Sequence, residues 1–304
     1  MSQMVGGTSL DAEWITALVI GMGLPILIQR PLLPVMEQKL WHKGMRRTNF
    51  RGTEIVTAGG LVIVFSTIMT GVMLLLFLLS KQTEGRVVQE GVWFHLGIVS
   101  MAFWGWLDDA SLEKEIKGFR GHFGALWRER KMTSGLWKVW GGGSTAMLIA
   151  YGLTDSFWSW LLGACVIAVS SNLLNLFDLR PARAIKVFWL ILLLGMIMSM
   201  LSVYPVSYTS GWLWLLPIFI STILMFRHDA GGKIMLGDTG ANVLGFAAGF
   251  ALVQGVPWQG QAVLFILFLF LQVASEFVSF SQIIAEVKWL KRIDSWGRSA
   301  EAEK

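Results

Sequence analysis

The stretch Phe157–Asp178 reads FWSWLLGACVIAVSSNLLNLFD and carries no charge until its final aspartate. An α-helix of about 20 apolar residues is long enough to cross a hydrocarbon core of about 30 Å. Inside lipid such a segment must be helical, because an unpaired backbone amide there costs several kcal/mol. The stretch therefore predicts a membrane-spanning helix that ends in a row of polar side chains.

The whole chain repeats this alternation of long apolar runs and short charged segments. Of its 304 residues, 54% are hydrophobic and only 15% are charged, whereas about a quarter of the residues of a soluble domain are charged. We therefore expect an all-α, polytopic transmembrane helical bundle of about nine spans, forming one domain over residues 1–304 with a tail at residues 286–304. The expected spans are Trp14–Ile28, Thr57–Ser80, Val92–Leu107, Val139–Leu153, Phe157–Phe177, Ile185–Val203, Trp212–Phe226, Asn242–Val253 and Val263–Ile284.

Lysine and arginine predict the orientation of these spans. Of the 25 such residues, all but Lys81 and Arg86 fall on one side of a nine-span arrangement. Because cytoplasmic loops carry the excess of positive charge, we expect the N-terminus outside and the C-terminus in the cytoplasm, in the cell (plasma) membrane. This bias also accounts for the net charge of +5 without a nucleic-acid partner.

Carboxylates and amides lie at the expected cytoplasmic ends of the third and fifth spans. Two adjacent acids, Asp108 and Asp109, lose hydration at a membrane boundary and favour a nearby cation, while a helix cap is the simpler alternative. Asn172 and Asn175 are three residues apart and share a helix face, which Asp178 continues. For this row, interhelical hydrogen bonding is the alternative.

Two further segments supply groups that bind anions. The motif Gly237-Asp238-Thr239-Gly240 leads into the eighth span, where free helix N–H groups can bind a phosphate and Asp238 can hold a metal; a capped turn is the alternative. The basic segment from Arg46 to Arg51 can receive an anion or only enforce topology. Together the polar segments provide what a magnesium-assisted reaction on a phosphate ester requires.

In this order, Leu107-Asp-Asp, Asn172-x-x-Asn175-x-x-Asp178 and Gly237-Asp-Thr-Gly resemble the motifs of the polyprenyl-phosphate N-acetylhexosamine-1-phosphate transferase family, over nearly the whole chain. This family includes the translocase that makes the first lipid intermediate of peptidoglycan. The resemblance implies transfer of a sugar-1-phosphate from a UDP-sugar to a polyprenyl phosphate, with release of UMP, at the start of a cell-envelope glycan pathway. In a bacterial setting the lipid would be undecaprenyl phosphate.

The resemblance also implies roles for individual residues. Asp108 and Asp109 match paired aspartates that deprotonate or orient the lipid phosphate, and Asp238 matches a ligand of the Mg²⁺ cofactor, for which Mn²⁺ is an alternative. Asn175 matches an amide that joins the metal or phosphate site. The substrate-binding candidates, named from the resemblance or from their own chemistry, are Asn172, Asp178, Arg180, Arg183, Lys138, Arg51 and Gly237.

Departures from the family pattern leave a second interpretation open, a catalytically inactive relative that binds lipid phosphate or a partner protein. The last cytoplasmic segment lacks a histidine-rich stretch, Met235 stands where many members have an aromatic residue, and Leu179-Arg180-Pro181 replaces a glycine-rich turn. A transporter is a third interpretation, but only the ninth expected span holds an acid, Glu276. The sugar, a homodimer and a route through an aspartyl-phosphate stay open.

Overall fold

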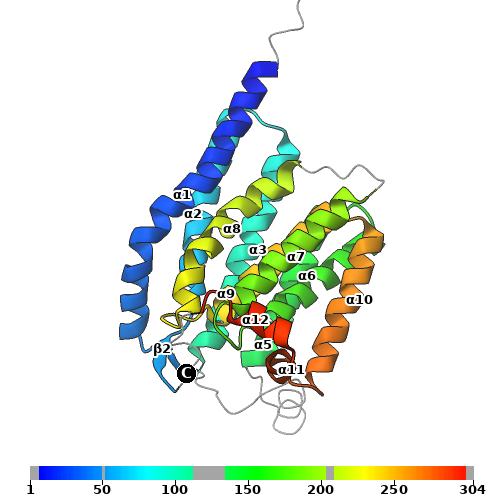
Figure 1. The fold of residues 1–304 in the computed structure, drawn as a ribbon. Helices are drawn as coiled ribbons and strands as arrows, with labels where there is room; N and C mark the ends of the chain where they lie inside the picture. The colour runs from blue at the N-terminus through cyan, green and yellow to red at the C-terminus, as the bar shows by residue number, and fades with distance from the viewer. Residues whose placement is uncertain (1–6, 50–51, 112–133, 203–208, 299–304) are drawn as a thin grey trace, which may run out of the picture.

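The structure is a computed structural model in which residues 7–49, 52–111, 134–202 and 209–298 are described (Figure 1). It confirms the predicted all-α helical bundle, with one small β-hairpin in the described part of the chain. The elements are α1 (Gly7–His42), β1 (Arg46–Thr48), β2 (Glu54–Val56), α2 (Gly60–Ser80), α3 (Gly85–Ala110), α5 (Ser134–Leu153), α6 (Phe157–Phe177), α7 (Arg183–Met200), α8 (Thr209–Ala230), α9 (Gly237–Gly255), α10 (Trp258–Ser275), α11 (Phe280–Glu286) and α12 (Lys288–Ser295).

Six of these helices, α1, α2, α6, α7, α8 and α10, are long and apolar enough to cross a membrane. The other three expected spans lie within α3, α5 and α9, which are not among these six helices. Helix α10 turns large apolar side chains away from the protein, including Val263, Ile266 and Phe270, each more than 60% exposed. Such a surface is suited to lipid contact. Together with the six long apolar helices, it indicates that the chain is a membrane protein.

Helix α9 lies at the centre of the bundle, and nearly all of its residues are buried. It packs against α3 and α6 over most of its length. Glycines allow the close approach: a Cβ on Gly105 of α3 would lie 2.4 Å from the backbone oxygen of Asp238. A Cβ on Gly245 would lie 2.4 Å from the backbone oxygen of Ser170 on α6. The start of α9 is therefore held at the ends of its neighbours.

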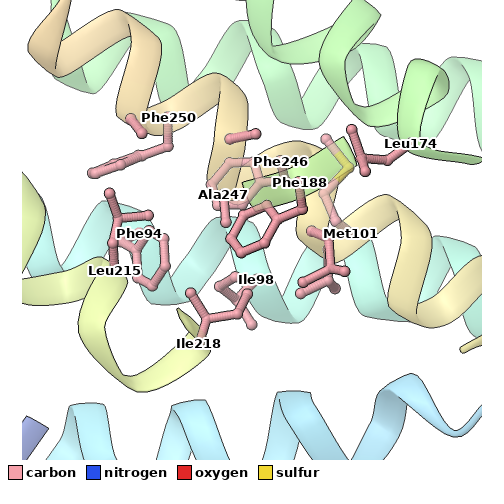
Figure 2. Packing of buried hydrophobic residues seen from close by; sticks show 14 of the residues in the cluster. Phe94, Ile98, Met101, Leu174, Phe188, Leu215, Ile218, Phe246, Ala247 and Phe250 are labelled. Carbon is pink, nitrogen blue, oxygen red and sulfur yellow. The ribbon is translucent and has the colours of Figure 1, made fainter. Parts of the chain in front are cut away.

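Aromatic and aliphatic side chains fill the space around α9. Figure 2 shows Phe246 and Phe250 of α9 packed beside Phe94 of α3, and the Phe94 and Phe250 ring centroids lie 5.0 Å apart at an interplanar angle of 66°. Edge-to-face arrangements of this kind are favoured by the ring quadrupoles. This core fixes the positions of the helices whose polar ends form the site.

Two boundaries differ most from the sequence prediction. The first span is predicted to end at Ile28, whereas α1 continues to His42 past Pro31 and Pro34, and the loop expected after it shortens to the β1–β2 hairpin. Prolines are tolerated in membrane helices where neighbouring groups satisfy the freed carbonyls. The ninth span is predicted to reach Ile284, whereas α10 ends at Ser275 and Glu276 begins the break before α11.

Candidate active site

Polar side chains from four helices meet at one end of the bundle, where α3 and α6 end and where α5 and α9 begin. Nζ of Lys138 on α5 lies 2.5 Å from Oδ2 of Asp238 and 3.9 Å from Oδ2 of Asp108. Asn175 on α6 joins them when its amide oxygen faces the lysine. Its Nδ2 then donates to Oδ1 of Asp238 over 3.0 Å, and its Oδ1 accepts from Nζ of Lys138 over 2.7 Å. We call these four residues the carboxylate–lysine cluster.

The carboxylate–lysine cluster is partly open, unlike the neighbouring Asp109. The side chains of Asp108, Asp238 and Lys138 are 24%, 18% and 15% exposed, whereas the side chain of Asp109 is fully buried. A ligand can therefore reach Asp108 but not Asp109. The two adjacent aspartates of the sequence motif have different environments.

Asp109 binds the first turn of α9. Its Oδ2 accepts hydrogen bonds from the backbone N and the hydroxyl of Thr239, over 2.9 and 2.7 Å. Its Oδ1 accepts one from the backbone N of Asp238 over 3.1 Å, and the guanidinium of Arg47 lies 3.8 Å away. A carboxylate at this position satisfies free helix N–H groups and interacts favourably with the helix dipole. Asp109 thus joins the end of α3 to the start of α9 and places Asp238.

Gly237 permits this close contact between two helix ends. Its φ is +69°, and a Cβ there would lie 2.7 Å from Oδ2 of Asp109. A side chain would be strained in this backbone conformation and would also collide with the carboxylate. The residues before Gly237 are fixed by backbone bonds, since the N of Met235 donates to the O of Val56 and the N of Gly59 donates to the O of Met235, both over 2.8 Å.

Burial and nearby charge shift the acids of this region in opposite directions. Burial alone would raise the pKa of Asp238, but the charge of Lys138 and hydrogen bonds lower it well below its ordinary value. Burial raises the pKa of Asp178 well above its ordinary value, and neighbouring carboxylates raise it further. Burial and the charge of Asp238 also raise the pKa of Asp109, against its hydrogen bonds. These opposite shifts favour ionisation of Asp238 and oppose ionisation of Asp178.

A hollow lies beside the carboxylate–lysine cluster, over the turn that follows α6. The turn is held by Asp229, whose Oδ2 accepts a hydrogen bond from the backbone N of Ala182 over 2.8 Å. Ala182 has a φ of +59°, which sharpens the turn before α7. The hollow combines apolar and polar walls, and its lining includes Asn49, Ile55, Asp178, Leu179, Arg180, Pro181, Asp229, Gly232 and Met235.

The donor atoms of the carboxylate–lysine cluster fit a magnesium ion that also binds phosphate. Asp108, Asp238 and Asn175 direct oxygen atoms toward one positive group, the ammonium of Lys138. The described residues contain no group of three or more His, Cys, Asp or Glu side chains that could hold a metal alone. Mg²⁺ commonly binds through one or two carboxylates and completes its coordination with water and substrate phosphates. The residues present are sufficient for that mode of binding.

Two of the predicted substrate-binding residues bind other helices instead of pointing into the site. Nδ2 of Asn172 donates to Oε1 of Gln272 on α10 over 3.0 Å, the interhelical bond that the sequence leaves open. Arg183 forms a two-point ion pair with Asp294 on α12, with Nε and Nη2 at 2.8 and 2.9 Å from its oxygens. Arg51 lies outside the described residues.

Sequence analysis gives no individual role to three residues that the structure brings to this region. Thr239 donates to Asp109, and its place directly after Asp238 in a helix-start motif is the only signal for this contact. Arg47 donates to the backbone O of Asp108 over 3.5 Å, although the sequence shows it only as part of a basic segment. In the sequence, Asp229 is only a lone acid near the expected end of a span. In the structure it is buried and holds the turn before α7.

The fold and site define a polytopic helical membrane protein with a carboxylate–lysine cluster at one end of its bundle. No protein-family model matches the chain, and no curated protein matches it. The resemblance to the sugar-1-phosphate transferases therefore stays a prediction that depends on the three sequence motifs.

Proposed function

We propose that this protein is a magnesium-dependent transferase that moves a sugar-1-phosphate from a UDP-sugar to a polyprenyl phosphate. The sugar is an N-acetylhexosamine, and the product starts a cell-envelope glycan. The chain crosses the cell membrane nine times, with its N-terminus outside and its site on the cytoplasmic side. The observation that carries the proposal is the convergence of Lys138, Asp108, Asn175 and Asp238 at the end of the bundle that also holds the basic β1–β2 hairpin.

In the proposed reaction, an oxygen of the lipid phosphate attacks the phosphorus that bears the sugar. A new P–O bond forms, the bond between this phosphorus and the oxygen of UMP breaks, and UMP leaves with the electron pair. Asp108 is the reachable acid, and it accepts the proton or orients the attacking phosphate. Lys138 contributes positive charge to the phosphates as negative charge moves to the leaving group.

Magnesium, when bound, supplies Lewis-acid stabilisation of the diphosphate charge. Asp238, Asn175 and Asp108 are the residues that would hold it, because their oxygens converge and Asp238 is ionised. Asp109 is a positioning residue in this proposal, since its oxygens are used by the start of α9.

The hollow over the turn is the proposed place of the nucleoside. Asp178 can bond to the base or ribose, and Arg180 can reach a phosphate. Met235 offers a polarizable side chain to the base where many members of the resembled family offer an aromatic ring. Asp178, which lines the hollow, is within the electrostatic influence of Asp238, which links the hollow to the carboxylate–lysine cluster.

The proposal is tested by measuring UMP release from purified protein in detergent with undecaprenyl phosphate and a panel of UDP-sugars. We expect release that requires lipid and magnesium, that is lost in Asp238→Ala, and that persists in Glu13→Gln at the far end of α1. A folded protein that is silent on the whole panel, yet binds lipid phosphate, would instead identify an inactive relative.

A further inference from the structure

Helix α12 carries a row of large apolar side chains on its solvent-accessible surface. Trp289, Ile293 and the adjoining Trp296 are 64%, 55% and 61% exposed. They lie about one helical turn apart, so they extend along one side of this segment. The helix is too short to cross a bilayer, and a soluble protein rarely exposes such a row.

Ionic contacts fix which side of α12 faces the bundle. Asp294 points to α7, where it forms the two-point ion pair with Arg183 and also lies 3.0 Å from Nη2 of Arg298. Nζ of Lys186, one turn further along α7, donates to the backbone oxygens of Ile293 and Asp294 over 3.1 and 2.6 Å. A lysine at the C-terminal carbonyls of a helix is favourable for the helix dipole.

An aromatic contact secures the end of the segment. The ring of Trp296 lies against Phe226 near the end of α8, with centroids 5.4 Å apart. Nε of Arg298 then donates to the backbone O of Pro181 over 3.2 Å. Thus α12 is attached to the ends of α7 and α8, and Figure 1 shows it crossing the lower part of the bundle. With Asp294 and the last carbonyls on α7, Trp289 and Ile293 stay exposed, and Trp296 stays 61% exposed despite its contact with Phe226.

The lipid surface is the occupant that fits this row. The helix to which α12 is attached, α7, exposes Leu190 and Leu193 further along its length, and such side chains are suited to lipid contact. Tryptophan is enriched at the boundary between headgroups and acyl chains. The exposed basic residues Lys288, Lys291 and Arg292 alternate with the apolar row, which is the charge that an anionic leaflet attracts.

We infer that α12 is an interfacial helix, which lies in the plane of the membrane on the side of the carboxylate–lysine cluster. Trp289, Ile293 and Trp296 enter the boundary between headgroups and acyl chains, and the basic residues bind anionic lipid phosphates. The inference does not depend on the proposed reaction, because it concerns only the lipid contacts of the segment.

The test compares two spin-labelled positions on α12 that are two residues apart and therefore about 200° apart around the helix. In a Cys165→Ala background, a nitroxide is attached to Ile293→Cys or Lys291→Cys, and the protein is reconstituted in nanodiscs with or without anionic phosphatidylglycerol. We expect the label at 293 to collide more with oxygen than with a nickel chelate, and the label at 291 to show the reverse. The depth at 293 should increase with anionic lipid.

Equal access of both labels to nickel would overturn the inference, because the row would then face water. A label at 293 that reaches neither reagent would also overturn it, because protein would then cover the row. If the membrane depth of the label at 293 is the same with and without anionic lipid, the proposed binding of the basic residues to lipid phosphates is wrong. If Ile293→Cys fails to fold, as judged by its thermal transition, Trp289→Cys provides the same comparison on the apolar side.

Discussion

Gly237 lies so close to Asp109 that a Cβ on the glycine would stand 2.7 Å from Oδ2 of the carboxylate. The same carboxylate accepts both polar hydrogens of Thr239. The end of α3 and the start of α9 are therefore assembled as one unit around Asp109. This unit places Asp238 beside Lys138, and the rest of the site follows from its geometry.

Replacement of Gly237 by alanine should destabilise the protein. The substitution forces a side chain into a left-handed conformation and against Asp109, and we expect a loss of about 1–3 kcal/mol in the free energy of unfolding. Thermal unfolding in detergent measures this loss. The matched control is Gly143→Ala on α5, where a Cβ would meet nothing within 4 Å. Equal transition temperatures for Gly237→Ala and the wild type would contradict the close contact.

Substitution of Asp109 should mainly reduce stability, whereas substitution of Asp108 should mainly reduce activity. Asp109→Asn turns an amide N–H₂ toward buried donors, so we expect its free energy of unfolding to fall by about 1–3 kcal/mol. Asp108→Asn should melt with the wild type and lose about 100-fold or more in the rate of UMP release. The two variants are compared in one series of melting curves and rate assays. The reverse pattern would show that Asp109 is the reacting acid.

Loss of the lysine charge should change the pH dependence of activity. In Lys138→Met, the largest cause that lowers the pKa of Asp238 is removed, so this pKa should rise from its lowered value. We expect the acid limb of the pH–rate profile to move to higher pH, together with a loss of about 100-fold in the rate at neutral pH. Lys138→Arg keeps the charge and should keep the acid limb. A profile of unchanged shape in Lys138→Met would contradict the assignment.

The attachment of α12 should survive mild acid. Burial would raise the pKa of Asp294, but its bonds and charge contacts with Arg183 and Arg298 lower it below the ordinary value of 3.8. The ion pair therefore contributes stability above that value and loses it as the pH falls through the lowered pKa. A spin label at Lys291→Cys on α12 should therefore keep the same mobility from pH 7 down to about pH 5, because the ion pair stays intact over this range.

Asp294→Asn tests the same attachment at neutral pH. It removes one charged partner of Arg183, and we expect α12 to detach more readily by about 1.5–3 kcal/mol. Limited trypsin cleavage after Lys291 or Arg292 should then be faster than in the wild type or in Ser295→Ala. Equal cleavage rates would show that the ion pair does not hold the segment.

The helical bundle could be predicted because a long apolar run, taken by itself, already indicates a helix that contacts lipid or the core. The meeting of Asp108, Asn175 and Asp238 also follows from topology, since all three lie at helix ends on the side with the basic loops. Their division of labour with Asp109 does not follow. It depends on the direction of the N–H groups at the start of α9, and the Leu107-Asp-Asp motif contains no information about that direction.

The sequence leaves interhelical bonding open for Asn172, but it identifies the partner of neither Asn172 nor Arg183. Their partners, Gln272 and Asp294, lie 100 and 111 residues away and come from helices near the end of the chain. An amide on a polar helix face and an arginine after a turn look alike whether they bind substrate or another helix. Only the packing of α10 and α12 against the bundle decides between these roles.

The measurement that tests the central claim most directly uses a UDP-sugar labelled with ³²P in the phosphate that bears the sugar. The purified protein is given this substrate, magnesium and undecaprenyl phosphate, and the products are partitioned between water and organic solvent. Our account predicts label in the lipid product and unlabelled UMP in water, with neither formed by Asp238→Ala. Label that stays in water as UDP, while the sugar enters the lipid, would show transfer of the sugar alone and would contradict the account.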